Sequence, residues 1–199
     1  MLSIFTIKMT FNFENSKKVF LAKKDKSSMQ QIDEKIRILC EKINQRKDYF
    51  TTSSCSGRIV LLADEEKKLP GLFLYRTHNK INLKNFKKIL QDTTKIAQGT
   101  ILFKQEPALL VVACKNKENQ WKLFSEARNN GWKKSGILSM DKKNLIELFA
   151  TEHISFPIIK NKKILVDDNF LKILVKKANE NLKKTWEKIK RLEELLEEL

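Results

Sequence analysis

Glycine is scarce in this chain of 199 residues, which has five, at positions 57, 71, 99, 131 and 136. Closely spaced glycines let a backbone approach a phosphate, as in G-x-G-x-x-G and in the P-loop. No two glycines of this chain have that spacing. A standard Rossmann or P-loop nucleotide site is therefore not expected, and any nucleotide-like ligand must be held in another way.

Cysteine and histidine are also few. The cysteines Cys40, Cys55 and Cys114 are odd in number, and the first nine residues lack the basic start and long apolar core of a secretory signal. We therefore expect a reducing, cytoplasmic setting. Together with His78 and His153 the cysteines show no paired-ligand spacing, so no metal is expected. No apolar run approaches the ~20 residues that span a bilayer, so no membrane partner is expected.

The net charge is strongly positive. Forty Lys and Arg residues against 24 Asp and Glu give +16, which favours a polyanionic partner. Residues 187–199 contain five acids and three bases, so residues 1–186 carry +18. Phe73, Tyr75, Trp121 and Trp132 interleave with basic residues, as a surface that grips phosphates and stacks a base requires. A lysine-rich proteome would give the same composition without that function.

The hydrophobic pattern predicts one domain over residues 1–199, with 1–12 as a flexible or upstream-start extension. Apolar residues at steps of three and four predict a helix between Ser28 and Gln45, and apolar runs interrupted by turn residues predict strands. We expect a strand pair within 49–64, further strands over about 72–77, 100–104, 108–114, 135–140, 145–151, 157–159 and 164–166, and further helices over 83–97, 119–130 and 168–199.

A helix followed by a Ser/Gly turn and a strand pair occurs twice, around SCSGRI and around KKSGIL, which indicates two similar lobes. The fold expected is α+β: a mixed β-sheet with flanking helices, two intertwined lobes and a long C-terminal helix, and not a Rossmann fold. That last helix, ~45 Å long, has one apolar side. We expect it to lie across the protein's own core, with a coiled-coil dimer seam as the alternative.

The run TTSSCSGR at residues 51–58 is the most unusual stretch of the chain. Its hydroxyl and backbone N–H donors stand beside the Arg58 guanidinium, a set suited to a carboxylate or a phosphate. An ordinary serine-rich turn is the alternative. Within this run, Cys55 has no histidine near it in sequence, which favours a structural role over that of a nucleophile.

Three titratable residues are further candidates. His78 ends a strand, where it can face a cleft. Glu106 interrupts an apolar sheet region just before a proline, so its carboxylate needs a partner or faces a pocket. Asp25 lies in a polar stretch before the first helix. The alternatives are a surface histidine and, near Asp25, helix capping by Ser27 or Ser28.

These motifs resemble the tRNA wybutosine-synthesising methyltransferase family of archaea and eukaryotes, from about Phe13 to the final helix. The segment FTTSSCSGRI at 50–59 is similar to the family's Ser-rich motif. Two departures are that Phe73 stands where the family has Trp, and that Met29-Gln30 replaces the Lys-Gly of a D-x-S-x-K-G pattern. The other matching positions are Asp25, Ser27, Leu74, Thr77, His78, Phe103, Glu106, Pro107, Cys114, Ala127, Gly131, Ser135, Gly136 and Ile137.

The resemblance implies methyl transfer from S-adenosyl-L-methionine to the nitrogen at ring position 4 of the wyosine precursor, next to the anticodon of tRNA(Phe). The sulfonium is already an activated donor, so in-line positioning and help with one proton suffice. The partner implied is the anticodon arm, and the protein is expected to be a monomer or a weak homodimer through its last helix. The residues implied are Asp25 and His78 as catalytic groups, and Ser53, Ser54, Ser56, Arg58, Glu106 and Ser135 around the cofactor.

Two other functions fit the residues without the resemblance. A non-catalytic RNA-binding protein would explain the charge, and a scaffolding protein would use the last helix for pairing. Only the enzyme is expected to bind S-adenosyl-L-methionine. For Arg58, a donor carboxylate and an RNA phosphate are both open as the bound group.

Overall fold

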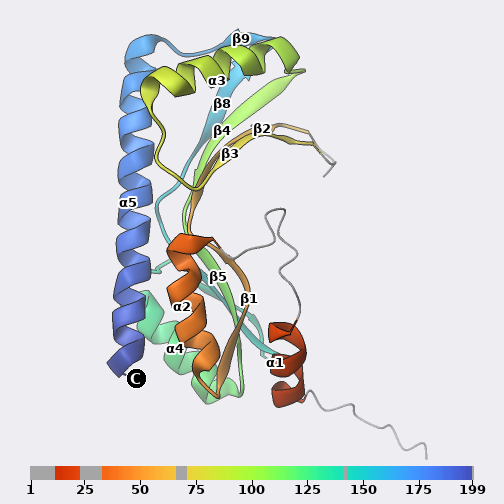
Figure 1. Cartoon of the computed structure of the whole chain (residues 1–199), viewed down its shortest axis with the longest axis vertical. Coiled ribbons are helices and arrows are strands. Elements are labelled where there is room, and N and C mark those ends of the chain that lie inside the picture. Colours follow the sequence, from red (N-terminus) through yellow and green to blue (C-terminus); the bar gives the residue numbers. More distant parts are fainter. Residues whose placement is uncertain (1–11, 23–32, 66–70, 141–142, 199) are drawn as a thin grey trace, which may run out of the picture.

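The structure, a computed structural model, describes residues 12–22, 33–65, 71–140 and 143–198. Two antiparallel β-sheets are placed end to end along one long helix, α5 (Asp168–Glu198) (Figure 1). Each sheet has its own hydrophobic core, and we call the two halves lobe A and lobe B. None of the described helices is long and apolar enough to cross a membrane.

Lobe A is built on a four-stranded sheet. Helices α2 (Glu34–Gln45) and α4 (Lys117–Asn129) cover one face of it, and α1 (Phe13–Leu21) lies on the other (Figure 1). Phe13 and Phe20 of α1 place their rings 5.3 and 5.7 Å from that of Phe50. In order across the sheet the strands are β1 (Tyr49–Cys55), β5 (Leu109–Cys114), β7 (Asn144–Phe149) and β6 (Gly136–Ser139).

Lobe B is built on a five-stranded sheet. Helix α3 (Leu83–Ile96) and the first half of α5 pack on one face of it, around buried Phe86, Phe103 and Leu174. In order across the sheet the strands are β3 (Phe73–Thr77), β2 (Arg58–Ala63), β4 (Thr100–Glu106), β8 (Ile154–Lys160) and β9 (Lys163–Ile164).

Three ribbons of chain join the lobes. β1 leads into β2 through Ser56-Gly57, β4 into β5 through Pro107-Ala108, and β7 into β8 through residues 150–153. Neighbouring ribbons run in opposite directions. The first and second ribbons pair antiparallel in both sheets, as β1 with β5 and as β2 with β4. The second and third ribbons do the same, as β5 with β7 and as β4 with β8. We call the region of these three crossings the waist.

Helix α5 contacts all three crossings of the waist. Gly57 lies against Leu182 and Thr185 of the helix, and Asn181 Nδ2 donates to Gln105 Oε1 at 2.7 Å. Lys188 Nζ, only 12% exposed, lies 2.7 and 2.8 Å from the two carboxylate oxygens of Glu152. About two turns of α5, residues 181–188, therefore hold the three ribbons in fixed relative positions.

The α+β class, the two lobes and the long last helix are confirmed. The expectation of one mixed sheet is wrong, since the described strands form two sheets and every strand pair is antiparallel. There are two sheets because each ribbon contributes one strand to each lobe, and the pairs are antiparallel because neighbouring ribbons run in opposite directions. Helix α5 lies across the protein's own cores, burying Leu174 and Leu182 in lobe B and Ile189 and Leu196 in lobe A.

The helix boundaries differ in two places from those expected. The periodicity predicts a helix from Ser28, whereas α2 starts at Glu34 after the N-cap Asp33, and residues 28–32 lie outside the described part. Helix α1, nine residues with the N-cap Asn12, was not expected. Its sequence FENSKKVFL buries only Phe13, which packs against Phe50, whereas Val19, Phe20 and Leu21 remain exposed. Asn82 caps α3, and its side-chain oxygen accepts from the N–H groups of Lys84 and Asn85.

Candidate active site

A pocket of about 370 Å³ opens at the waist, between the two sheets. Its size is within the usual range for small-molecule sites, roughly 300–1,000 Å³. All three ribbons contribute to it, so a ligand bound there touches both lobes. The residues that line it are Ser53, Ser54, Cys55, Arg58, Glu106, Pro107, Leu109, Phe149 and His153.

Arg58 and Glu106 form an ion pair at the mouth of this pocket. They are directly opposed in the β2–β4 register, and Arg58 Nε lies 2.5 Å from Glu106 Oε2. Both side chains are a little over one quarter exposed. The contact fixes the plane of the guanidinium through Nε, and the terminal nitrogens of a guanidinium are those that bind carboxylates and phosphates in pairs.

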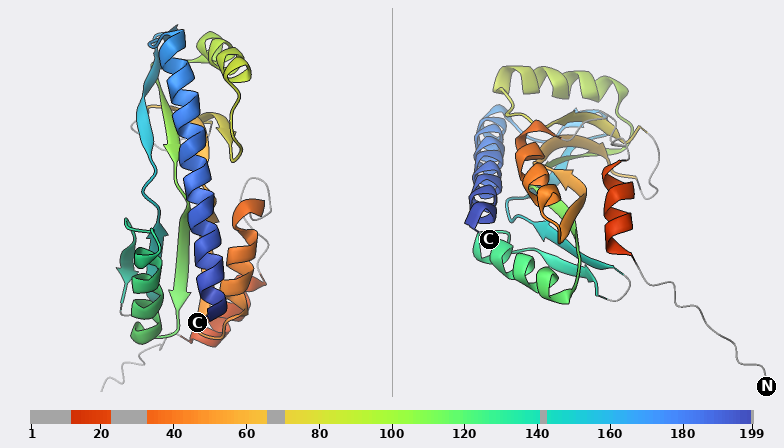
Figure 2. Two further views of the ribbon diagram at one scale, coloured as in Figure 1. Left: turned by 90° about the vertical axis from the view of Figure 1, so that its left-hand side faces the viewer. Right: turned by 60° about the horizontal axis from the view of Figure 1, so that its bottom comes forward.

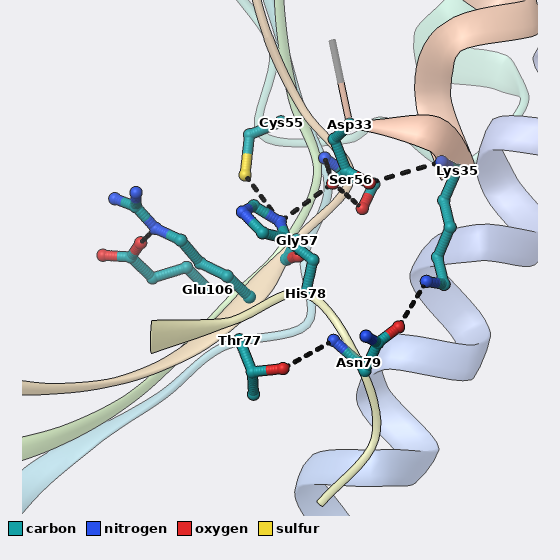
Figure 3. A network of polar contacts seen from close by, with 10 residues as sticks. Asp33, Lys35, Cys55, Ser56, Gly57, Thr77, His78, Asn79 and Glu106 are labelled. Atoms are coloured by element: carbon teal, nitrogen blue, oxygen red, sulfur yellow. Dashed lines mark hydrogen bonds and ion pairs between the residues drawn. The ribbon is translucent and has the colours of Figure 1, made fainter. Parts of the chain in front are cut away.

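The carboxylate of Asp33 accepts four hydrogen bonds, from Ser56, His78 and Lys35 (Figure 3). Its Oδ2 atom accepts from the Ser56 backbone N–H at 3.1 Å, from the Ser56 hydroxyl, and from His78 Nδ1 at 2.8 Å. Its Oδ1 atom caps α2 by accepting from the N–H of Lys35. One carboxylate thus joins α2, the first crossing and the end of β3.

The protonation states of this pair follow from the contacts. The hydrogen bond to Asp33, together with the nearby Cys55 thiol, raises the pKa of His78 to about 10. Burial raises the pKa of Asp33, but the hydrogen bonds from His78 and Ser56 outweigh burial and lower that pKa to about 2. At neutral pH the pair is therefore an imidazolium and a carboxylate. His78 is already protonated and cannot take a proton from a substrate there.

The thiol of Cys55 has a histidine partner that its sequence neighbours do not show. Cys55 Sγ lies 3.9 Å from His78 Nδ1 (Figure 3), although 23 residues separate them. Cys40 and Cys114 are different, because burial raises the pKa of their thiols to about 11 and about 12 and keeps both protonated. Cys55 is thus the cysteine placed to meet a ligand.

The structure brings most of the predicted site residues together. Ser53, Ser54, Arg58 and Glu106 line the pocket, and Ser56 is buried beside it, bound to Asp33. Asp25 lies outside the described residues.

Ser135 is placed differently from the other predicted residues. Its hydroxyl is buried, donates to the Trp132 carbonyl at 2.6 Å and accepts from the Phe149 N–H at 3.0 Å. It does not line the pocket. The resemblance implies that Ser135 lies around the cofactor, which stays a prediction. In the structure both contacts of its hydroxyl are to backbone atoms and fix the end of β7.

Four residues of the site were missed from the sequence. The position of Asp33, an acid directly before the periodic apolar residues of α2, is typical of an N-cap, but nothing in the sequence links it to His78. Leu109, Phe149 and His153 reach the pocket because β5 and the third crossing lie beside the first. These three residues are brought to the pocket by the order of the strands in the sheet, which no local sequence pattern predicts.

Among the described residues, no group of three or more His, Cys, Asp or Glu residues able to hold a metal ion is found. The lining of the pocket combines a guanidinium and serine hydroxyls with the apolar side chains of Pro107, Leu109 and Phe149. This pairing fits a ligand with an anionic group and an apolar or aromatic body.

Comparisons with known proteins agree on one family. The model of the methyltransferase family TYW3 matches residues 15–198. A relative from Pyrococcus abyssi, named tRNA(Phe) 7-((3-amino-3-carboxypropyl)-4-demethylwyosine(37)-N(4))-methyltransferase 1, is 33% identical over 197 residues, covering 97% of this chain and 100% of the relative. A zebrafish relative, named tRNA wybutosine-synthesizing protein 3 homolog, is 32% identical over 94% of this chain and 75% of its own length.

The fold is also shared with solved structures. A protein from Pyrococcus horikoshii has a TM-score of 0.79 and 31% identity, over 93% of this chain and 96% of that one. A protein from Aeropyrum pernix has a TM-score of 0.71 and 26% identity, over 83% of this chain and 98% of that one. The family match, the relatives and the shared fold together show that this chain belongs to the TYW3 family of methyltransferases.

Proposed function

We propose that the protein transfers a methyl group from S-adenosyl-L-methionine to the N4 nitrogen of a 4-demethylwyosine derivative at nucleotide 37 of tRNA(Phe), as the names of its relatives state for them. The observation that carries the placement of this reaction is the waist pocket, where Arg58 and Glu106 face apolar walls. The partner proposed is the anticodon arm, and the setting is the cytoplasm.

The donor and the pocket match in chemistry. S-adenosyl-L-methionine has a carboxylate that suits the Arg58 fork and an adenine that suits Leu109, Pro107 and Phe149. Glu106 holds the fork in place and lowers the net charge around the sulfonium. When bound, the donor supplies an electrophilic methyl group, so no covalent intermediate on the protein is needed.

The transfer needs alignment more than acid–base chemistry. N4 attacks the methyl carbon, the bond from carbon to sulfur breaks, the sulfur leaves as a neutral thioether, and the proton on N4 passes to solvent. The imidazolium of His78, fixed by Asp33 2.8 Å away, offers positive charge to the electron-rich base or to a phosphate beside it. Its role in this proposal is electrostatic, in place of the proton transfer that a neutral histidine would perform.

We further propose that the protein acts as a monomer. Most of the apolar side of α5 is buried against its own lobes, in residues such as Leu182 and Leu192. Sedimentation at high protein concentration tests this proposal, and a concentration-dependent dimer would contradict it.

Arg58→Ala is expected to weaken binding of S-adenosyl-L-methionine by about 10- to 100-fold, because a charge-assisted, paired hydrogen bond is lost. Calorimetric titration of the RNA-free protein measures it. Arg37→Ala is the matched control, since Arg37 is exposed and paired with Glu41 on the far side of α2, and no change is expected.

The result also separates the two anions that Arg58 can bind. If donor binding is unchanged while the KM for precursor tRNA rises, Arg58 binds an RNA phosphate and the donor lies elsewhere in the pocket. If neither value changes, Arg58 is not part of the site. A wild-type protein that binds no S-adenosyl-L-methionine and does not methylate precursor tRNA would overturn the proposed function itself.

A further inference from the structure

The five-stranded sheet of lobe B, which we call sheet B, has one covered face and one open face. Ile59, Phe103 and Tyr75 point to the side packed by α3 and α5, so the residues that alternate with them point away. Figure 1 shows α3 and α5 on one side of this sheet and no described helix against the other. We call the following set the open face of sheet B: Arg58, Leu62, Phe73, Arg76, Leu102, Lys104, Glu106, Ser155 and Pro157. Phe73 belongs to it because the β2–β3 register shifts after Leu61 and sets Phe73 opposite Leu62. Val60 alternates in the same way but is fully buried.

Phe73 is the most unusual residue of this face. It is a large apolar side chain that remains 46% exposed, which costs hydrophobic free energy unless a partner covers it. Two guanidinium groups lie over its ring, with Arg58 Cζ 5.2 Å and Arg76 Cζ 5.8 Å from the ring centroid. An exposed ring bordered by two cations is the arrangement with which proteins bind an unpaired nucleobase and its phosphates.

The charge of the face is complementary to RNA. Arg76 and Lys104 lie on either side of Val60 in the β3–β2–β4 register, so they extend the positive charge across three strands. The one acid of the face, Glu106, is neutralised by Arg58 at 2.5 Å. A polyanion therefore meets a net positive surface there.

Arg58 also connects this face to the waist pocket. The same side chain lines the pocket and lies over Phe73. A nucleotide adjacent in sequence to one held in the pocket would therefore lie within reach of Phe73.

We propose that the open face of sheet B binds unpaired RNA, with the base of a nucleotide that flanks the target stacked on Phe73 and its phosphates near Arg76 and Lys104. This inference rests on the proposed function for the identity of the RNA. It concerns unpaired nucleotides because the base faces of a duplex are occupied by their neighbours, so only an unpaired base can stack on a side chain.

The test is the binding of an anticodon stem-loop RNA to Phe73 variants, measured by fluorescence anisotropy. Phe73→Leu keeps an apolar cover over the strand and removes the ring, and it is expected to raise the Kd for the RNA about tenfold. Phe73→Trp is expected to keep or improve affinity. Phe170→Ala, which truncates a ring of similar exposure, 44%, at the start of α5, is expected to leave the Kd unchanged.

The salt dependence separates stacking from charge. Arg76→Ala is expected to reduce the slope of log Kd against log salt by about 1, whereas Phe73→Leu should leave the slope unchanged. Calorimetric titration with S-adenosyl-L-methionine should give wild-type affinity for Phe73→Leu, since the ring does not line the pocket.

Two outcomes would overturn the inference. One is a Phe73→Leu protein that is folded by circular dichroism and binds the stem-loop like the wild type. The other is a perfect RNA duplex that competes as well as the stem-loop for the wild-type protein. Neither depends on the methyl transfer assay, so a failure of the proposed function, seen as no methylation by the wild type, stays distinguishable.

Discussion

Gly57→Ala is expected to lower the free energy of unfolding by about 3–4 kcal/mol. Gly57 has φ +93°, which an L side chain rarely adopts and which costs about 1–3 kcal/mol. An added Cβ would also lie 3.0 Å from the Glu106 carbonyl oxygen and 3.3 Å from Thr185 Cγ2. The first is a backbone atom of the second crossing, which cannot move without moving the pocket. Urea unfolding monitored by circular dichroism measures the loss.

Gly99→Ala is the matched control for this prediction. Gly99 also has a positive φ, +70°, but nothing lies within 4 Å of its ideal Cβ, so only backbone strain of about 1 kcal/mol is expected. The difference between the two variants isolates the close approach at the waist. Equal losses would show that the crossing of the two ribbons tolerates a methyl group, and that this approach does not stabilise the fold.

Asp33→Ala is expected to destabilise the protein by about 3–4 kcal/mol at pH 6, because it leaves the partly buried His78 and Ser56 donors unpaired and removes the cap of α2. Asp33→Asn retains a capping side chain and is expected to lose about 2 kcal/mol, the part due to charge. Asn82→Ala at the start of α3, a cap with backbone partners only, should lose about 1 kcal/mol.

The pH dependence of this loss identifies the ion pair. The pKa of Asp33 falls from 3.8 to about 2 on folding, so its contribution is present above pH 3.8 and disappears as the pH falls through 2. The pKa of His78 rises from 6.5 to about 10, so its contribution is complete below pH 6.5 and disappears as the pH rises through 10. The stability difference between wild type and Asp33→Asn should therefore be largest between about pH 4 and 6.5.

Chemical denaturation from pH 3 to pH 10 measures this difference. The Asn82→Ala loss should stay constant over the same range, because no titrating group contacts that cap. A flat Asp33→Asn difference would mean that the carboxylate acts through neutral hydrogen bonds alone, and that His78 is not held as an imidazolium.

Local elements of the fold were predictable from the residues. The continuous apolar run Leu109–Cys114 indicates a strand covered on both faces, and the stripe from Leu174 to Leu196 indicates a helix with one buried side. The pairing of strands was not predictable in the same way. The run TTSSCSGR does not indicate that the chain passes from one sheet to the other at Gly57, because this crossing depends on contacts with Glu106 and α5, which are distant in sequence.

The site shows the same division between local and long-range signals. Arg58 and Glu106 stood out as charged residues beside apolar strands, and they meet at the pocket. Asp33 did not stand out, because an acid before a helix is normally explained by capping, and it does cap α2. Its second role requires His78, 45 positions away, to end its strand opposite the cap.

The way α5 spans both lobes has a consequence for synthesis of the protein. Each core is closed by this helix, with Leu174 and Leu182 in one and Ile189 and Leu196 in the other. As the chain leaves the ribosome, both sheets must therefore keep part of their apolar faces uncovered until residues 168–198 have been made. The two lobes consequently cannot mature one after the other, and both are expected to complete their folding together, after synthesis of α5.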